Sequence, residues 1–178
     1  FDIDGEPVGA IAIGAGDEIL VAGASNGRIW AWNLKTKDQL FSVSAHDGAV
    51  LSVAVTREGD KVVTGGEDGR VRITDISTGE AFVEIEASDN AIRSVAVTGA
   101  GDQLAAAGDD GILRLFEVET GDRVASYEGH GAAITSVAYG KDEKVVHTAS
   151  LDGTTRVFER ENGTELAQAI STTDGWAV

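Results

Sequence analysis

The sequence predicts an all-β protein made of four similar units, each with four antiparallel strands. An Asn or Asp followed by glycine recurs at a fixed interval of 42 residues, at the glycines Gly27, Gly69, Gly111 and Gly153. Between these points, short runs alternate large apolar residues with small or polar ones, and no stretch has a helical period. An interval of this length is typical of proteins built from stacked repeats.

The expected elements follow the same order in every unit, as residues 50–91 illustrate. An apolar strand, LSVAV at 51–55, is followed by a polar loop and a second strand, VVTGG at 62–66. An Asp-Gly pair then leads into a third strand, RVRIT at 70–74, and this pair favours a tight type I′ hairpin turn. After a polar turn comes a more polar fourth strand, AFVEI at 81–85.

Four antiparallel strands in each unit, with the most buried first and the most exposed last, describe one blade of a β-propeller. A single blade cannot bury both of its faces, so neighbouring blades must cover them. We expect blades at residues 8–49, 50–91, 92–133 and 134–175, with 1–7 as the tail of a preceding blade and 176–178 as the start of a following one.

The chain resembles the WD-repeat β-propeller family over nearly its whole length. The resemblance rests on GHGAAITSVAY…TASLDGTTRVFE in the fourth unit and AHDGAVLSVAV…TGGEDGRVRITD in the second. Family units place a Gly-His pair before the first strand and Trp-Asp at the end of the third. The resemblance implies four divergent repeats of a larger ring of seven or eight blades, within a multidomain protein of bacterial style.

The resemblance also implies a buried hydrogen-bonded set in each blade: the loop His, a second-strand Ser or Thr, the turn Asp and the third-strand Trp. No unit is complete. The first has Asp4 at the His position, the second and fourth have Thr74 and Phe158 at the Trp position, and the third keeps only Asp110. The residues that match are His46, Thr64, Asp68, Asp110, His130, Thr148, Asp152 and Trp32. We assign them a structural role, not a catalytic or metal-binding one.

Two further positions invite a functional interpretation. Arginine recurs on the third strand, at Arg72, Arg114 and Arg156, and we expect these side chains to form salt bridges between blades. His147 occupies a second-strand position that is apolar in the other units, and we expect it to be a packed core histidine.

Family members usually hold peptides on the upper face of the ring, through loop residues before the first strand and the residue before the turn Asp. Here these positions carry small residues and four carboxylates: Asp47, Glu67, Asp89 and Asp109. A basic partner segment is therefore expected, with binding that weakens as salt rises. A solvated face without a partner is the alternative.

Composition excludes several classes of function. The 178 residues carry a formal charge of −16, which repels phosphate backbones and anionic lipids, so we expect neither nucleic acid nor membrane as a partner. Without cysteine, disulfides, thiolate metal sites and cysteine nucleophiles are impossible.

We find no catalytic triad, phosphate loop or zinc spacing, and expect no enzyme activity, cofactor or metal. We expect a cytoplasmic location. Because methionine is absent even at position 1, we expect the chain to start inside a longer product.

Together, these expectations predict that the chain is a protein–protein interaction or scaffold module within a larger protein. Its partner is expected to be a protein or peptide, and its open edges call for flanking blades or domains of the same chain, or a second copy that completes the ring. Two alternatives stay open. One is a quinoprotein-like propeller enzyme, suggested by GRIWAWNLKTKDQLF at 27–41, and the other is a purely structural spacer.

Overall fold

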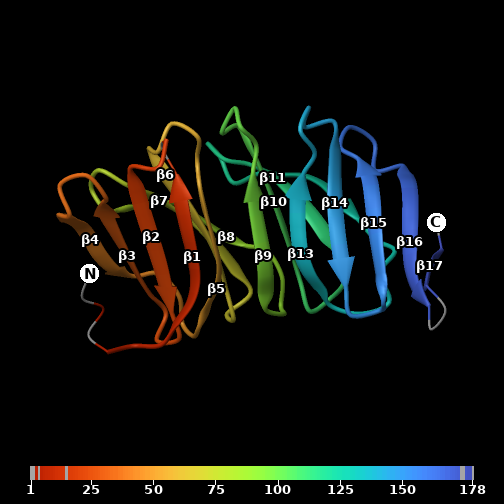
Figure 1. Ribbon diagram of the computed structural model, residues 1–178, viewed down its shortest axis with the longest axis horizontal. Coiled ribbons are helices and arrows are strands. Elements are labelled where there is room, and N and C mark those ends of the chain that lie inside the picture. Colours follow the sequence, from red (N-terminus) through yellow and green to blue (C-terminus); the bar gives the residue numbers. More distant parts are fainter. Residues whose placement is uncertain (1–2, 4, 15, 173–174, 178) are drawn as a thin grey trace.

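The computed structural model describes residues 3, 5–14, 16–172 and 175–177. The described residues form strands joined by turns and short loops, without a helix. The strands make four separate antiparallel sheets that follow one another along the chain (Figure 1). This arrangement confirms the predicted all-β class and the four-stranded unit.

Each sheet is a simple up-and-down meander of consecutive strands. The first contains β1 (Val8–Gly14), β2 (Ile19–Ala24), β3 (Arg28–Asn33) and β4 (Gln39–Ser44). The second contains β5 (Val50–Val55), β6 (Lys61–Gly66), β7 (Arg70–Asp75) and β8 (Ala81–Glu86). The third contains β9 (Ile92–Val97), β10 (Gln103–Gly108), β11 (Leu113–Glu117) and β12 (Arg123–Tyr127). The fourth contains β13 (Ile134–Tyr139), β14 (Val145–Ser150), β15 (Thr154–Glu159), β16 (Glu165–Thr172) and β17 (Gly175–Ala177).

The two ends of the chain differ in how they relate to the repeat. The repeat frame places residues 176–178 at the start of a following blade, whereas in the structure β17 pairs with the outer strand β16. The outer edge of β16 offers unpaired backbone groups, which accounts for this pairing. At the other end, Ile3 packs against the first sheet. Phe1, Asp2 and Asp4, which belong to the expected tail of a preceding blade, lie outside the described residues, as does Val178.

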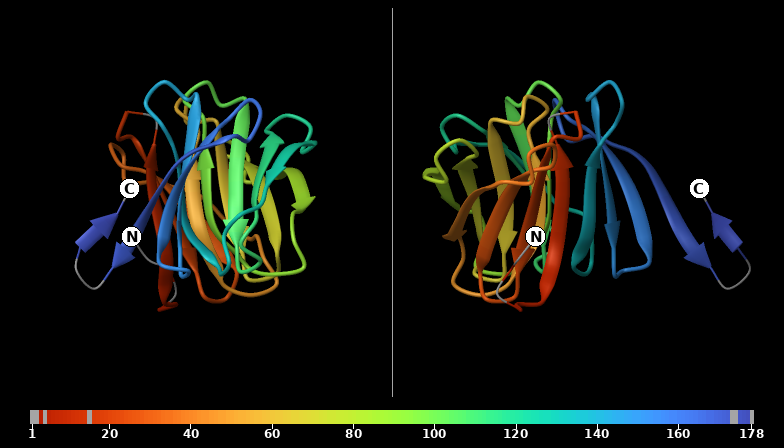
Figure 2. Two further views of the ribbon diagram at one scale, coloured as in Figure 1. Left: turned by 90° about the vertical axis from the view of Figure 1, so that its right-hand side faces the viewer. Right: turned by 60° about the vertical axis from the view of Figure 1, so that its left-hand side comes forward.

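The sheets stack face to face, with their first strands side by side: β1 against β5, β5 against β9, and β9 against β13 (Figures 1 and 2). The core lies between the sheets as three layers. Val62 of β6 joins the layer shared with the first sheet, and its neighbour Val63 joins the layer shared with the third. Both faces of an inner sheet are therefore buried, as the alternation of apolar residues on its strands requires.

The array is open, because the first and fourth sheets lie at opposite ends of the molecule (Figure 1). Each end sheet therefore has one face without a neighbouring sheet.

The Asx-Gly hairpins differ from the predicted type I′ turn. Only the glycine has a positive φ, which is 77° at Gly69, whereas Asp68 before it does not. The amide of Gly69 donates to the carbonyl of Gly66 at 3.3 Å, and Asp68 Oδ1 accepts from the amide of Arg70 at 3.1 Å. This is a three-residue loop that ends on a left-handed glycine. The Asx side chain closes the turn itself, so a second left-handed residue is unnecessary.

Candidate functional site

In the second sheet, the predicted His, Thr and Asp meet in one hydrogen-bonded set. His46 Nδ1 lies 2.9 Å from Asp68 Oδ1, and His46 Nε2 lies 2.8 Å from Thr64 Oγ1. Asp68 Oδ2 also accepts a hydrogen bond from the amide of Asp47 at 3.0 Å. The set therefore ties the β4–β5 loop to the β6–β7 hairpin and to the second strand.

Electrostatics give this set its protonation state. Burial lowers the pKa of His46 and outweighs the hydrogen bond and charge of Asp68. Burial tends to raise the pKa of Asp68, but hydrogen bonds from His46 and from backbone amides hold it below its usual value. The imidazole is therefore neutral at pH 7, with Nδ1–H donating to the charged Asp68 and the Thr64 hydroxyl donating to Nε2.

The fourth sheet repeats the arrangement. His130 Nδ1 lies 2.9 Å from Asp152 Oδ2, and His130 Nε2 lies 2.7 Å from Thr148 Oγ1. Thr154 adds its hydroxyl, which donates to Asp152 Oδ1 at 2.7 Å. These hydrogen bonds outweigh burial, which acts to raise the pKa of Asp152, and hold that pKa well below its usual range.

The third sheet has a reduced set, because Ser88 stands where the other two have histidine. Ser88 Oγ donates to Asp110 Oδ2 at 2.7 Å, and Arg114 Nη1 lies 2.7 Å from the same oxygen. On the fourth strand, the residue opposite Arg114 is Ser126, which offers no charge. Arg114 therefore pairs with the turn Asp of its own sheet.

The predicted salt bridges between blades at the recurrent arginines are wrong. Arg72 pairs with Glu84 at 3.0 Å, and Arg156 pairs with Glu165 at 2.8 Å, in each case within one sheet. For Arg72 the reason is register, because Glu84 lies directly opposite it on the neighbouring strand. An ion pair that does cross between sheets joins Lys61 to Glu119 at 3.2 Å.

Two other predicted residues lie away from these sets. Trp32 is buried in an apolar cluster with Trp30 on the outer face of the first sheet, against which Ile3 packs. His147 is exposed, which contradicts the expectation of a packed histidine. It faces the open side of the fourth sheet, where no further blade covers it.

The four predicted binding carboxylates lie on consecutive loops at one end of the second and third sheets. We call this end the hairpin face; it holds the β6–β7 and β10–β11 hairpins with the β4–β5 and β8–β9 loops. Asp47 follows β4, Glu67 lies in the β6–β7 hairpin, Asp89 follows β8 and Asp109 lies in the β10–β11 hairpin.

Three of these carboxylates already have a partner within the chain. Arg93 pairs with Asp109, and the amide of Ala49 donates to Glu67 Oε2 at 3.2 Å. Arg70 Nη1 lies 3.8 Å from Asp47, a loose contact that leaves the Asp47 side chain 89% exposed. Sequence reasoning missed Arg70 and Arg93; their positions directly after the turn glycine and at the start of β9 were the available signal.

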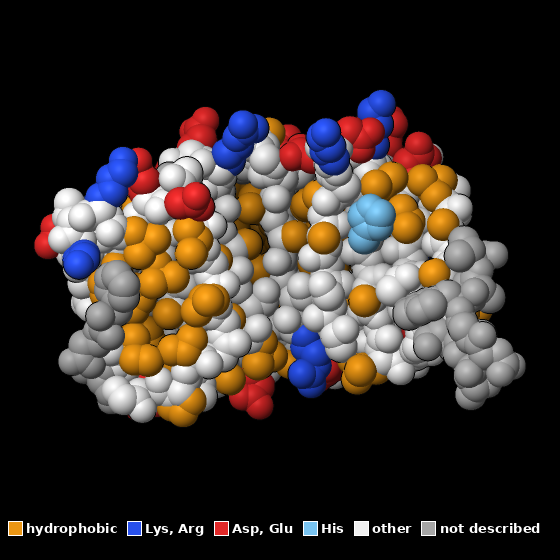
Figure 3. Space-filling view, in the orientation of Figure 1, with side chains coloured by type: hydrophobic (Ala, Val, Ile, Leu, Met, Phe, Trp, Pro, Cys, Tyr) orange, Lys and Arg blue, Asp and Glu red, His pale blue; other side chains and the backbone are white. Residues whose placement is uncertain are grey.

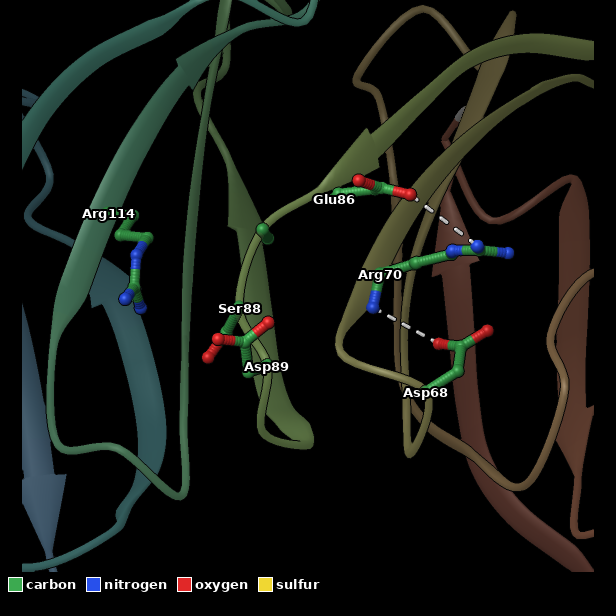
Figure 4. Close-up of a pocket in the computed structure, with 7 residues that line it drawn as sticks. Asp68, Arg70, Glu86, Ser88, Asp89 and Arg114 are labelled. Carbon is green, nitrogen blue, oxygen red and sulfur yellow. Dashed lines mark hydrogen bonds and ion pairs between the residues drawn. The ribbon is translucent and has the colours of Figure 1, made fainter.

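A cavity of about 560 Å³ opens at the hairpin face between the second and third sheets (Figure 4). It is lined by Asp68, Arg70, Glu86, Ala87, Ser88, Asp89 and Arg114. The smaller Ser88 in place of histidine leaves room there. Figure 4 shows Arg114 on one side, Arg70 on the other, and Asp89 between them. Asp89 makes no hydrogen bond or ion pair with the other residues that the structure describes.

The described residues contain no group of three or more His, Asp and Glu arranged to hold a metal ion. Nor does any of them belong to a helix of the length and apolar character that crossing a membrane requires. The hairpin face is a polar surface, with charged side chains of both signs and an open cavity.

Comparison with known proteins agrees with this architecture. The family model described as "WD domain, G-beta repeat" matches residues 37–75, 80–117 and 121–159. Each match runs from the fourth strand of one sheet to the third strand of the next. No curated protein matches the chain.

Among solved structures, a chain in the "Crystal Structure of Mitotic Checkpoint Complex" is similar to this one with a TM-score of 0.85 and 16% sequence identity. The alignment covers 94% of this chain and 54% of that chain. The present chain thus spans about half the length of that chain, and at this identity the likeness concerns the fold alone.

Proposed function

This chain belongs to the WD40-repeat family of β-propellers, and from that premise we propose that it is a protein-interaction scaffold that recognises basic segments of its partners. WD40 propellers typically act as scaffolds in protein assemblies, and the similar solved chain belongs to a protein complex. The charged side chains of the hairpin face support the basic chemistry of the partner.

The observation that carries the proposal is Asp89 in the lining of the cavity between the second and third sheets. It has no ionic partner among the described residues, and Glu86 lies in the same lining, 3.6 Å from Arg70 Nη2. Asp47 occupies the equivalent loop position one repeat earlier, and its side chain is almost fully exposed. A lysine or arginine of a partner would pair with Asp89 and Asp47, and the net charge of −16 would attract it from a distance.

Contacts within the chain reduce the number of carboxylates that are free to bind a partner. Asp109 and Glu67 are occupied by Arg93 and a backbone amide, so a partner cation must compete for them. We therefore assign the main contacts to Asp47 and Asp89, with the other two contributing to the general negative field.

The test uses a fluorescent peptide rich in lysine and arginine, titrated with the protein at low and high salt. We expect Asp47→Asn together with Asp89→Asn to weaken binding roughly 2- to 30-fold at low salt, because each of the two exposed ion pairs contributes about 0.2–1 kcal/mol. The matched control is Asp122→Asn, which removes an exposed carboxylate from the β11–β12 turn at the opposite end of the third sheet.

Binding that ignores ionic strength would contradict the proposal, as would an equal loss in the Asp122→Asn control. A glutamate-rich peptide of the same length serves as the negative probe and should not bind.

We propose further that the chain has no enzymatic activity of its own, in keeping with the typical WD40 role. The two histidines that resemble general bases, His46 and His130, have buried side chains, and each contacts a Thr and an Asp of its own blade. These contacts support a structural role. A cytoplasmic location is part of the same proposal.

The open faces of the first and fourth sheets expose apolar residues. We propose that further blades cover them in the functional protein, from flanking parts of the same polypeptide or from a second copy. The support is the burial of both faces in the inner sheets, compared with the exposed apolar residues of the end sheets.

A further inference from the structure

Neighbouring sheets are joined by a repeated contact between their inner strands. Ser52 Oγ on β5 accepts a hydrogen bond from the amide of Val95 on β9 at 3.0 Å. Ser94 Oγ on β9 accepts one from the amide of Val137 on β13, also at 3.0 Å. Each serine therefore links the inner strand of its own sheet to that of the following sheet.

The fourth sheet carries the next member of this series, but without its partner. Ser136 stands 42 residues after Ser94, and its hydroxyl makes no hydrogen bond with the residues that the structure describes. Cross-strand pairing places Ser136 opposite Ala149 and Ala138 opposite His147, and His147 in turn lies opposite Val157. These residues share one open face. We call this the trailing face.

The other three sheets carry an apolar residue at the position of His147. The position of His147 is occupied by Val21, Val63 and Ala105 in the first three sheets, and all three are fully buried against the following sheet. The trailing face of the fourth sheet is therefore built like an internal junction.

The first sheet presents the complementary surface. Ile11 and Ile13 of β1 are 66% and 55% exposed. Their equivalents on β5, Val53 and Val55, pack into the layer between the first and second sheets. Figure 3 shows hydrophobic side chains gathered over β1 and β2. We call this the leading face; the amide of Ile11 stands at the position that donates to serine in the later sheets.

We propose that two copies of the chain pair through these faces, with the trailing face of each copy packed on the leading face of the other. Ser136 Oγ of one copy then accepts a hydrogen bond from the amide of Ile11 of the other. Because one chain carries both halves of the junction, two such joints close a two-fold ring that leaves no open face. The inference rests on the proposed covering of the open faces and commits to a second copy as its source.

The composition of the joint suits this occupant. The residues that define the two faces include no Asp or Glu, so the large negative charge of each copy stays outside the contact. Ile3 stands at the repeat position of Ala45 and Ala87, both buried in internal junctions. In the pair, Ile3 stays in this position, and the fourth sheet of the other copy packs beside it with its residues up to Ile170.

The test measures the mass of the chain in solution by sedimentation equilibrium over a wide range of concentrations. We expect a species of twice the chain mass of 18.4 kDa, and no larger one. Ile11→Glu places a charge in the apolar joint and should produce monomer. Its matched control is Val124→Glu on β12, where the valine is 50% exposed and lies on neither face, and which should leave the pairing unchanged.

Two further variants test the joint from the other side. Ser136→Ala should weaken each joint about 2- to 10-fold, the usual contribution of one hydrogen bond. His147→Val should tighten the pairing, because it restores the apolar residue found at the internal junctions. If circular dichroism shows that Ile11→Glu does not fold, His147→Val still tests the pairing.

A mass of 18.4 kDa at every concentration overturns the proposal, as does a ladder of oligomers larger than two, which signals a joint that does not close. Pairing that survives Ile11→Glu or is not tightened by His147→Val also overturns it. Binding of the basic peptide to the monomeric Ile11→Glu variant is scored separately, so failure of the pairing leaves the proposal for the hairpin face intact.

Discussion

His46 and His130 occupy the same place in the second and fourth sheets, and each connects a loop between blades to a hairpin and to a second strand. The residue types of these sets are visible in the sequence, because their spacing follows the repeat. The third sheet is different: Arg114 pairs with Asp110, and the uncharged Ser126 lies opposite Arg114, a relation that is set by the register between strands.

Removing one of these histidines should destabilise the fold. His130→Ala leaves the Asp152 carboxylate and the Thr148 hydroxyl without their imidazole partner, at a cost of about 1–3 kcal/mol. A chain of this size should then lose roughly 2–12 °C in Tm. Thermal denaturation measures this, with the exposed Lys141→Ala as control. An unchanged Tm would show that the set contributes nothing to stability.

Acid should destabilise the protein in two stages. The pKa of His46 is lowered in the fold from its ordinary 6.5, so the unfolded chain takes up more protons as pH falls below that value. The pKa values of Asp68 and Asp152 are lowered from 3.8, and their contribution is present above that pH and lost as pH falls through the folded values.

Urea denaturation midpoints between pH 7.5 and about pH 3 would measure this dependence. We expect the midpoint to decline from about pH 6.5 and more steeply below about pH 4. In His46→Gln the first decline should shrink while the second persists. A midpoint that rises on acidification would contradict the assigned direction of these pKa shifts.

At the scale of elements, the hairpins show how a local rule and a neighbouring sheet act together. Gly69 has a φ of 77°, and a Cβ built there would lie 2.1 Å from the carbonyl oxygen of Ser88. Gly153 has a φ of 82°, with nothing within 4 Å of such a Cβ. Both turns require a residue that adopts a positive φ. Only Gly69 also lies close to a loop, because only there does the chain continue through a loop into a following sheet.

This difference gives a matched pair of substitutions. Gly153→Ala should cost about 1–2 kcal/mol for the left-handed conformation alone. Gly69→Ala should cost more, because the loop at Ser88 must also shift. Urea denaturation of the two variants measures both free energies of unfolding. Equal losses would show that the contact with the following sheet is unimportant to the turn.

The whole molecule is a four-sheet arc with a polar hairpin face and two open sheet faces, and the proposed partners are assigned to these surfaces. Charge composition pointed to a basic partner, but the free charge on the hairpin face is smaller than the four carboxylates suggest. Arg93 neutralises Asp109 and Arg70 approaches Asp47, while Asp89 stays open beside the cavity. The proposed assignment of one face to a peptide and of the others to further blades therefore rests on packing across the whole array.

The sequence alone determined the strands, the repeat of 42 residues and the hairpin positions marked by Gly27 and Gly69, because alternation and glycine conformation act within a few residues. Only the tertiary structure decided the turn type, the partners of the arginines, the exposure of His147 and the cavity beside Asp89. These depend on register between strands and on which sheet lies next to which. Such relations join residues far apart in the chain, and no local pattern records them.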